Sequence, residues 1–199
     1  MNKASNISHL YILSGGRSRR FGSDKALAEI NGVPILQSVV DGLRPYSEYV
    51  TLITGQTKRY KEFGTRVITD KPSGVGPIGG LCAALTDRKV THGEGWLLLA
   101  ACDLVQPHKE WIKPLIKYIT STDARAIAYR GDQWEPMLAL YHTDLLPTVD
   151  GMIRQHSFAM HRLLVQVNAQ AVDLPDGQTG IPQVNTPAEF VTAQKLGTL

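Results

Sequence analysis

Short apolar runs that alternate with segments of helical periodicity constrain the fold of this chain more than any other feature. The runs have the length and composition of buried strands. We expect strands at 9–13, 49–54, 66–69, 96–101, 125–129, 136–141 and 165–172. We expect helices near 34–44, 77–88, 108–120, 144–155, 158–164 and 187–197. This order predicts a three-layer α/β fold, in which a mainly parallel sheet has helices on both faces.

Length and composition bound the number of domains. With 199 residues, of which 43% are hydrophobic and 20% charged, the chain can bury one substantial core. No repeat or interdomain linker divides the sequence, so we expect one domain over 1–199. No apolar stretch reaches the length of a membrane span, and the N-terminus Met-Asn-Lys-Ala-Ser lacks an apolar signal core. We therefore expect a cytoplasmic protein without a membrane partner.

The segment 13–25, directly after the first expected strand, combines glycines with positive charge. Its glycines let backbone N–H groups approach an anion, and they are Gly15, Gly16 and Gly22. Its cations are Arg17, Arg19, Arg20 and Lys25. The spacing fits neither the Gly-x-Gly-x-x-Gly fingerprint nor the P-loop. Open α/β sheets bind ligands at this edge, so the segment predicts a triphosphate site rather than a solvated turn.

The positive charge of the chain is local. The formal net charge is +3, and residues 17–25 contain four cations and one acid, Asp24, so the remainder is balanced. A protein that binds duplex nucleic acid needs cations spread over a face or a helix, and no such stripe is evident. The charge pattern favours a small anionic ligand and excludes nucleic acid as an expected partner.

A second candidate follows the apolar run 96–101, where Asp103 lies at the expected ligand-binding edge of the sheet. A carboxylate at this position suits Mg²⁺, which proteins hold with one or two carboxylates together with phosphate oxygens. The alternative is that Asp103 only caps the next helix. Pro107 disfavours a helix that begins at 104, which weakens this alternative.

The Gly/Pro-rich segment 72–80 allows two interpretations. Its glycines could let the following helix pack close to the sheet. They could also offer free N–H groups at a helix N-terminus to a ligand. The residues alone leave both open.

Four motifs resemble those of the MobA-type molybdenum cofactor guanylyltransferases, within the nucleotidyltransferase superfamily. Leu-Ser-Gly-Gly-Arg-Ser-Arg-Arg-Phe-Gly-Ser-Asp-Lys at 13–25 is similar to Leu-Ala-Gly-Gly-x-x-x-Arg-Met-Gly-x-Asp-Lys. Gly-Pro-Ile-Gly-Gly at 76–80, Trp-Glu-Pro-Met-Leu-Ala-Leu-Tyr at 134–141 and Val-Asn-Thr-Pro-Ala-Glu at 184–189 resemble further motifs. The last also predicts a capping box, with Thr186 at Ncap, Pro187 at N1 and Glu189 at N3.

The resemblance, which extends over nearly the whole chain, implies a Rossmann-like nucleotidyltransferase fold. The N-terminal part would bind the nucleotide and the C-terminal part a pterin. Implied nucleotide contacts are Leu13, Ser14, Gly15, Gly16, Lys25, Thr54, Asp70 and Asp103. Implied catalytic residues are Arg19, Arg20, Lys25 and Asp103, with Asp103 as the Mg²⁺ ligand. Implied substrate contacts are Gly76, Pro77, Gly79 and Asn185, and Gln183 stands where the family often has a second asparagine.

The implied reaction transfers GMP from GTP to the terminal phosphate of molybdenum-molybdopterin and releases pyrophosphate. A phosphate oxygen is already anionic, so the reaction needs positioning and charge neutralisation rather than a general base. Proteins that insert or transfer the cofactor would be its protein partners. Three alternatives stay open: a molybdopterin cytidylyltransferase, a sugar-phosphate nucleotidyltransferase and a non-catalytic nucleotide-binding regulator. The Gly-Gly at 15–16 favours the guanylyl branch, and Asp103 argues against a regulator.

Overall fold

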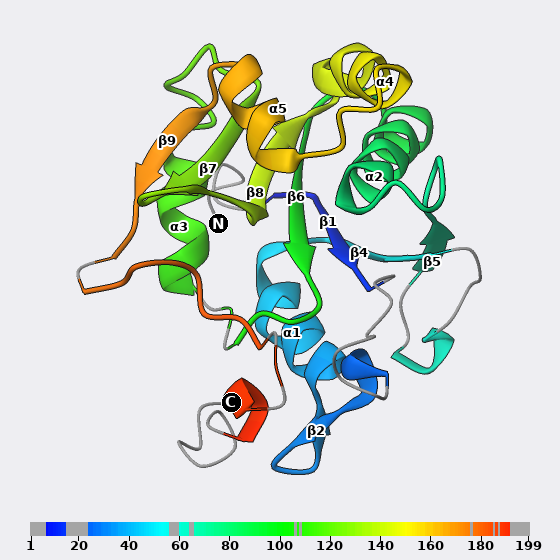
Figure 1. Cartoon of the computed structure of the whole chain (residues 1–199), viewed down its shortest axis with the longest axis vertical. Helices are drawn as coiled ribbons and strands as arrows, with labels where there is room; N and C mark the ends of the chain where they lie inside the picture. Colours follow the sequence, from blue (N-terminus) through cyan, green and yellow to red (C-terminus); the bar gives the residue numbers. More distant parts are fainter. Residues whose placement is uncertain are drawn as a thin grey trace.

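A seven-stranded sheet, in the order β5-β4-β1-β6-β8-β7-β9, forms the middle layer of the protein (Figure 1). The computed structural model describes residues 7–14, 24–55, 60–63, 66–105, 107, 109–175, 177–184, 186 and 188–191. The strands are β1 (His9–Leu13), β4 (Tyr49–Thr54), β5 (Arg66–Thr69), β6 (Trp96–Ala101), β7 (Ala126–Arg130), β8 (Trp134–His142) and β9 (Gln170–Asp173). β8 runs antiparallel to its neighbours β6 and β7, and the other pairs are parallel.

In the described part of the chain, α-helices cover the two faces of the sheet. They are α1 (Ile35–Leu43), α2 (Pro77–His92), α3 (Lys109–Lys117), α4 (Leu146–Arg154) and α5 (Met160–Gln166). α1 and α3 pack on one face, and α2, α4 and α5 pack on the other (Figure 1). Side chains of β1 alternate between these layers: Leu10 and Ile12 join the first core, and Tyr11 joins the second. The predicted three-layer, mainly parallel fold is confirmed.

Short elements connect the strands and helices of this framework. A small antiparallel hairpin, β2 (Glu29–Ile30) and β3 (Val33–Pro34), precedes α1 and was not predicted. Single 3₁₀ turns occupy η2 (Lys25–Leu27), η3 (Arg44–Tyr46), η4 (Lys61–Phe63) and η5 (Thr143–Leu145). No helix in the described ranges is long and apolar enough to cross a membrane.

The strand expected at 165–172 is wrong over its first half. α5 continues to Gln166 and ends in a left-handed turn at Asn168, with φ of 47°. The amides of Asn168 and Ala169 donate to the carbonyls of Val165 and Leu164, the pattern of a Schellman motif, and β9 begins only at Gln170. Val165 is apolar but 61% exposed on the helix, so its β-branched side chain misled the strand prediction.

The C-terminal helix is described only at 188–191, and the remainder of the range expected at 187–197 lies outside the described residues. The predicted capping box is confirmed for its two reciprocal bonds. The Thr186 amide donates to Glu189 Oε2 at 3.1 Å, and the Glu189 amide donates to Thr186 Oγ1 at 3.2 Å.

Candidate functional site

The carboxyl ends of four adjacent parallel strands bring the predicted residues to one edge of the sheet. Leu13 and Thr54 are the last residues of β1 and β4. Asp70 directly follows β5, and Asp103 lies two residues beyond the end of β6. In the parallel register Leu13 pairs with Ile53 on one side and with Ala101 on the other. This edge is where open α/β sheets bind ligands.

Lys25 and Asp103 form a charged pair at this edge. Lys25 Nζ lies 2.8 Å from Asp103 Oδ2, and the two side chains are only 14% and 19% exposed. The other carboxylate oxygen, Oδ1, is buried and has no hydrogen-bond partner in the described part of the chain. A buried acceptor without a partner costs roughly 1–3 kcal/mol. Asp103 is therefore held on one oxygen and available to a ligand on the other.

The available oxygen of Asp103 fits a hard divalent cation such as Mg²⁺, which prefers carboxylate and phosphate oxygens. Within the described ranges no three His, Cys, Asp or Glu side chains are grouped closely enough to hold a metal by themselves. A cation at Asp103 would therefore take most of its ligands from water and from a bound phosphate compound. This is the usual arrangement for Mg²⁺ at a nucleotide.

Asp24 is the N-cap residue of the turn that begins at Lys25. Its side chain caps η2, because Oδ1 accepts a hydrogen bond from the Ala26 amide at 3.2 Å. The hydroxyl of Tyr60 donates to the same carboxylate, at 2.8 Å from Oδ1 and 2.7 Å from Oδ2. Asp24 appeared in the sequence only as part of the motif, and Tyr60 carried no local signal. Neither was predicted as a site residue.

The end of β1 is fixed between its two neighbours. The Ser14 amide donates to the Ile53 carbonyl at 2.8 Å, and the Cys102 amide donates to the Leu13 carbonyl at 3.0 Å. The Ser14 hydroxyl also donates to the Ile53 carbonyl, at 3.2 Å, and its residue is only 2% exposed. The Ser14 side chain thus stabilises the sheet, and the backbone is held by hydrogen bonds at the residue that precedes the glycine-rich segment.

The segment 72–80 packs α2 closely against the sheet edge. A Cβ at Gly80 would lie 2.3 Å from Leu13 Cδ2 and 3.5 Å from Asp70 Oδ1, and one at Gly79 would lie 2.3 Å from the Pro72 carbonyl oxygen. Gly76 caps α2 with φ of +79°, and Pro77 is the first helical residue. The close-packing interpretation is confirmed for Gly79 and Gly80, whereas a Cβ at Gly74 or Gly76 would meet no atom within 4 Å. Contact with a substrate stays a prediction.

Asp70 lies beside this packed helix. Its amide donates to the carbonyls of Thr54 at 3.1 Å and Gly55 at 3.3 Å, which fixes its backbone at the end of β5. Burial raises the pKa of the Asp70 carboxyl above its usual value. In the strand order β5-β4-β1-β6, Asp70 follows β5 and Asp103 follows β6, so β4 and β1 lie between them.

The segment after β9 returns to Asp103 (Figure 1, orange to red). Gln183 forms an antiparallel bridge with Leu104, the Val105 amide donates to the Pro182 carbonyl, and the Val184 amide donates to the Asp103 carbonyl, both at 2.9 Å. No pattern in the sequence predicted this pairing. Five predicted site residues lie outside the described residues, namely Gly15, Gly16, Arg19, Arg20 and Asn185.

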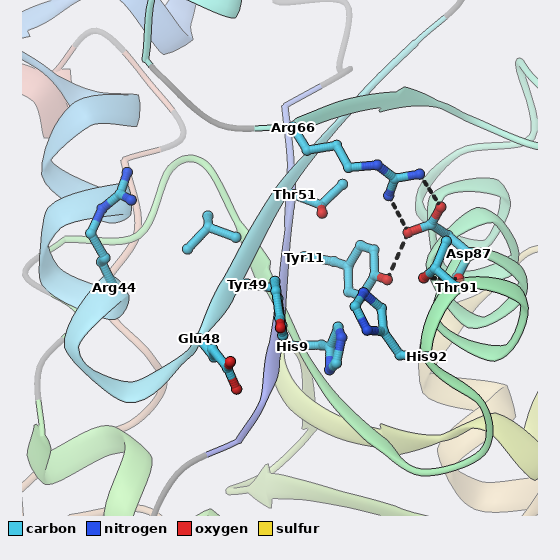
Figure 2. Close-up of a pocket in the computed structure, with 11 residues that line it drawn as sticks. His9, Tyr11, Arg44, Glu48, Tyr49, Thr51, Arg66, Asp87, Thr91 and His92 are labelled. Atoms are coloured by element: carbon cyan, nitrogen blue, oxygen red, sulfur yellow. Dashed lines mark hydrogen bonds and ion pairs between the residues drawn. The ribbon is translucent and has the colours of Figure 1, made fainter.

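A cavity of about 260 Å³ lies at the opposite edge of the sheet, and none of the predicted site residues lines it (Figure 2). Its walls come from the amino ends of β1, β4 and β5 and from the last turns of α2. Asp87 joins two strands there, because it accepts hydrogen bonds from the Tyr11 hydroxyl at 2.8 Å and from Arg66 Nη2 at 2.6 Å. The ring of His9 lies 5.0 Å from that of Tyr49 and 4.2 Å from that of His92.

Comparison with known sequences places this site in context. A family model described as the MobA-like NTP transferase domain matches residues 10–171. The chain is 29% identical over 191 residues to a molybdenum cofactor guanylyltransferase of Pseudomonas aeruginosa, with 94% of each protein covered. It is 29% identical over 182 residues to the protein of the same name from Shewanella putrefaciens, with 89% of this chain and 91% of that protein covered.

Solved structures share the fold. Molybdopterin-guanine dinucleotide biosynthesis protein A of Archaeoglobus fulgidus superposes with a TM-score of 0.77 at 22% identity, over 95% of this chain and 98% of that chain. CMP:2-keto-3-deoxy-manno-octonic acid synthetase, in a complex with CTP, superposes with a TM-score of 0.72 at 13% identity, over 96% and 98% of the two chains. At these identities the likeness shows a common Rossmann-like architecture.

Proposed function

Because this chain belongs to the MobA-like NTP transferase family and is a nucleotidyltransferase, we propose that it transfers GMP from GTP to the terminal phosphate of molybdenum-molybdopterin. The products would be the guanine dinucleotide form of the cofactor and pyrophosphate. The observation that carries this proposal is the Lys25–Asp103 pair at the carboxyl edge of the sheet. Its ammonium group suits a triphosphate, and its unpartnered carboxylate oxygen suits a cation.

The proposed reaction is an in-line displacement at the α-phosphorus of GTP. An anionic oxygen of the pterin phosphate forms the new bond, and the bond to the β-phosphate oxygen breaks, so that pyrophosphate leaves with the bonding electrons. No proton has to be removed from the attacking oxygen. Catalysis then depends on holding the two phosphates in line and on neutralising the charge that develops.

Different residues would bind the triphosphate and hold the cation. Lys25, together with Arg19 and Arg20, would bind the triphosphate, and Asp103 would hold Mg²⁺ through Oδ1. Mg²⁺, when bound, neutralises negative charge on the phosphate oxygens. The hydrogen bond between Lys25 and Asp103 Oδ2 keeps the ammonium group at the edge, so a triphosphate meets a cation that is already oriented.

Choice of the base is proposed to involve Asp70, beside Leu13 and Thr54. Guanine offers two neighbouring donors, N1–H and N2–H, to a carboxylate, whereas cytosine offers only its exocyclic amine. Asp70 lies against Gly80 and Leu13, where a base on the backbone of 13–16 could reach it. The fold does not decide the base, because the fold is shared with a synthetase in complex with CTP. The names of the sequence relatives support guanine.

We propose one domain over 1–199, in which the N-terminal part binds the nucleotide and the C-terminal part completes the pterin half of the site. Gly76, Pro77, Gly79 and Asn185 are the proposed contacts. The return of 182–184 to Asp103 supports this division, because it brings the C-terminal part beside the proposed reaction centre. We place the reaction in the cytoplasm and propose that cofactor insertion or transfer proteins receive its product.

The test supplies purified protein with Mg²⁺, each nucleoside triphosphate in turn, and a carrier loaded with molybdenum-molybdopterin. Pyrophosphate release and the nucleotide attached to the pterin are then measured. The proposal predicts a product with GTP alone. A product with CTP alone would assign the chain to the cytidylyl branch, transfer only to a sugar phosphate would assign it to that class, and binding without turnover would indicate a regulator.

A further inference from the structure

We propose that Tyr60 is a positioning residue for nucleotide binding, which acts on Lys25 through Asp24. The Tyr60 hydroxyl donates to the carboxylate of Asp24, 36 positions away in the chain, and lies within 2.8 Å of both carboxylate oxygens. This inference deepens the proposed function, because it concerns how the triphosphate half of that site is held in shape.

The Tyr60 side chain has a fixed position. It is only 4% exposed and belongs to the same core cluster as Ala26 and Phe63. Its ring lies 6.2 Å from that of Phe63, and its carbonyl accepts a hydrogen bond from the Phe63 amide at 3.3 Å. The packed ring therefore delivers its hydroxyl to a defined point.

The backbone of Tyr60 supports a special role. Its φ is +62°, a conformation that residues other than glycine rarely adopt and that costs of the order of 1–3 kcal/mol. Such a conformation persists only where the surroundings hold it. Here this backbone conformation accompanies a side-chain position in which the Tyr60 hydroxyl donates to the Asp24 carboxylate.

Asp24 stabilises the turn η2 by capping it. This 3₁₀ turn has three residues, and a turn of that length has little stability of its own. The Asp24 carboxylate bonds the Ala26 amide, and the Asp24 carbonyl accepts from the Leu27 amide at 3.0 Å. A carboxylate fixed by the Tyr60 hydroxyl cannot rotate away from this cap, so the turn keeps its orientation.

The turn η2 presents Lys25 to Asp103. Lys25 is the first residue of the turn, and its ammonium group reaches Asp103 Oδ2 at 2.8 Å. Contacts thus run from Tyr60 through Asp24 and η2 to Lys25, and they link the chain after β4 to the chain after β6. Loss of the Tyr60 hydroxyl should leave the Lys25 ammonium group less well positioned without removing its charge.

The experiment compares wild type with Tyr60→Phe and with Tyr129→Phe as a matched control. The Tyr129 hydroxyl is buried and donates to the Trp111 carbonyl at 2.9 Å, on the opposite half of the sheet. Both variants lose one hydrogen bond of a buried tyrosine, and only one loses a contact to η2. Thermal unfolding gives the structural cost of each change. Calorimetric titration with GTP and Mg²⁺ gives the nucleotide affinity.

We expect Tyr60→Phe to weaken GTP binding by roughly three- to tenfold, the worth of one hydrogen bond. The KM for the pterin substrate should not change, and Tyr129→Phe should bind GTP as wild type does. In a Lys25→Ala background, Tyr60→Phe should change GTP affinity no further, because the residue through which it acts is gone.

Wild-type GTP affinity in folded Tyr60→Phe protein would overturn the inference, and so would an additive loss in the Lys25→Ala background. Asp24→Asn provides a second route if Tyr60→Phe folds poorly, and it should show the same dependence on Lys25. Failure of the proposed function is a separate result. If the protein prefers CTP, the same titrations with CTP still measure whether the effect of Tyr60→Phe on nucleotide affinity depends on Lys25.

Discussion

Lys25 Nζ and Asp103 Oδ2 lie 2.8 Å apart, although 78 positions separate the two residues in the chain. The parallel order of β1 and β6 makes this possible, because the loops that follow the two strands leave the sheet at the same edge. Asp103 thus uses one oxygen to orient a cation of the protein, and its second oxygen is buried without a partner among the described residues.

Replacement of Asp103 by asparagine should separate the two uses of the carboxylate. The amide oxygen can still accept from Lys25, but the negative charge that favours a divalent cation is lost. We expect kcat to fall by about 100-fold or more, with a higher Mg²⁺ concentration for half-maximal activity. Mg²⁺ titrations of activity and Mn²⁺ binding measure this effect. Asp41→Asn, on the exposed face of α1, is the control, and an unchanged Mg²⁺ dependence in Asp103→Asn would contradict the assignment.

Gly80→Ala should damage the packing of α2 at the site. The new Cβ would lie 2.3 Å from Leu13 Cδ2, so the Leu13 side chain or the helix must move. We expect a loss of about 1–3 kcal/mol in the free energy of unfolding and a raised KM for GTP. Gly151→Ala is the matched control in α4, where a Cβ meets no atom within 4 Å. It should stabilise the protein by about 0.5–1 kcal/mol and leave KM unchanged.

Urea unfolding of the two glycine variants, combined with steady-state kinetics, measures both quantities. Equal stability changes in Gly80→Ala and Gly151→Ala would show that α2 does not pack as closely as described.

His9 should make the protein less stable in mild acid. Burial, with help from the charges of Arg88 and His92, lowers the pKa of His9 from 6.5 to about 4, against an opposing effect of Asp87. Above pH 6.5 both states are neutral at His9 and its contribution is fully present. Between pH 6.5 and 4 the unfolded chain binds a proton that the folded protein does not, so stability falls by up to about 1.4 kcal/mol per pH unit.

Urea unfolding at several pH values compares wild type with His9→Gln and with His161→Gln, which removes an exposed histidine. The His9→Gln profile should be flatter across pH 4 to 6.5, and the His161→Gln profile should follow wild type. Parallel profiles for wild type and His9→Gln would contradict the burial of a neutral imidazole.

The sequence was informative where a local pattern coincides with a structural position. Asp103 follows an apolar run, and in a parallel sheet the ends of such runs share one edge, so its placement could be predicted without any contact. Thr186 and Glu189 form a capping box because the interaction spans only three positions. In each case the physical cause lies within a few residues of the chain. Asp70 was singled out only by the resemblance to the family.

The remaining features depend on contacts between distant segments. The bond from Tyr60 to Asp24 and the pairing of Gln183 with Leu104 join segments that no local pattern relates. The strand prediction near Val165 failed because a β-branched residue on an exposed helix face looks like a strand residue. For Gly79 and Gly80, the sequence allowed either close packing or ligand contact, and only the three-dimensional arrangement shows that packing requires both.

The central claim, that the Lys25–Asp103 pair forms the triphosphate half of a guanylyl transfer site, is tested most directly by GTP-dependent turnover of Lys25→Ala. The measurement is pyrophosphate release with Mg²⁺ and molybdenum-molybdopterin, beside wild type and beside Lys61→Ala, which removes an exposed lysine of η4. We predict a loss of about 100-fold or more in Lys25→Ala that retains a cooperative unfolding transition, and unchanged turnover in Lys61→Ala. Wild-type turnover in folded Lys25→Ala protein would contradict the claim.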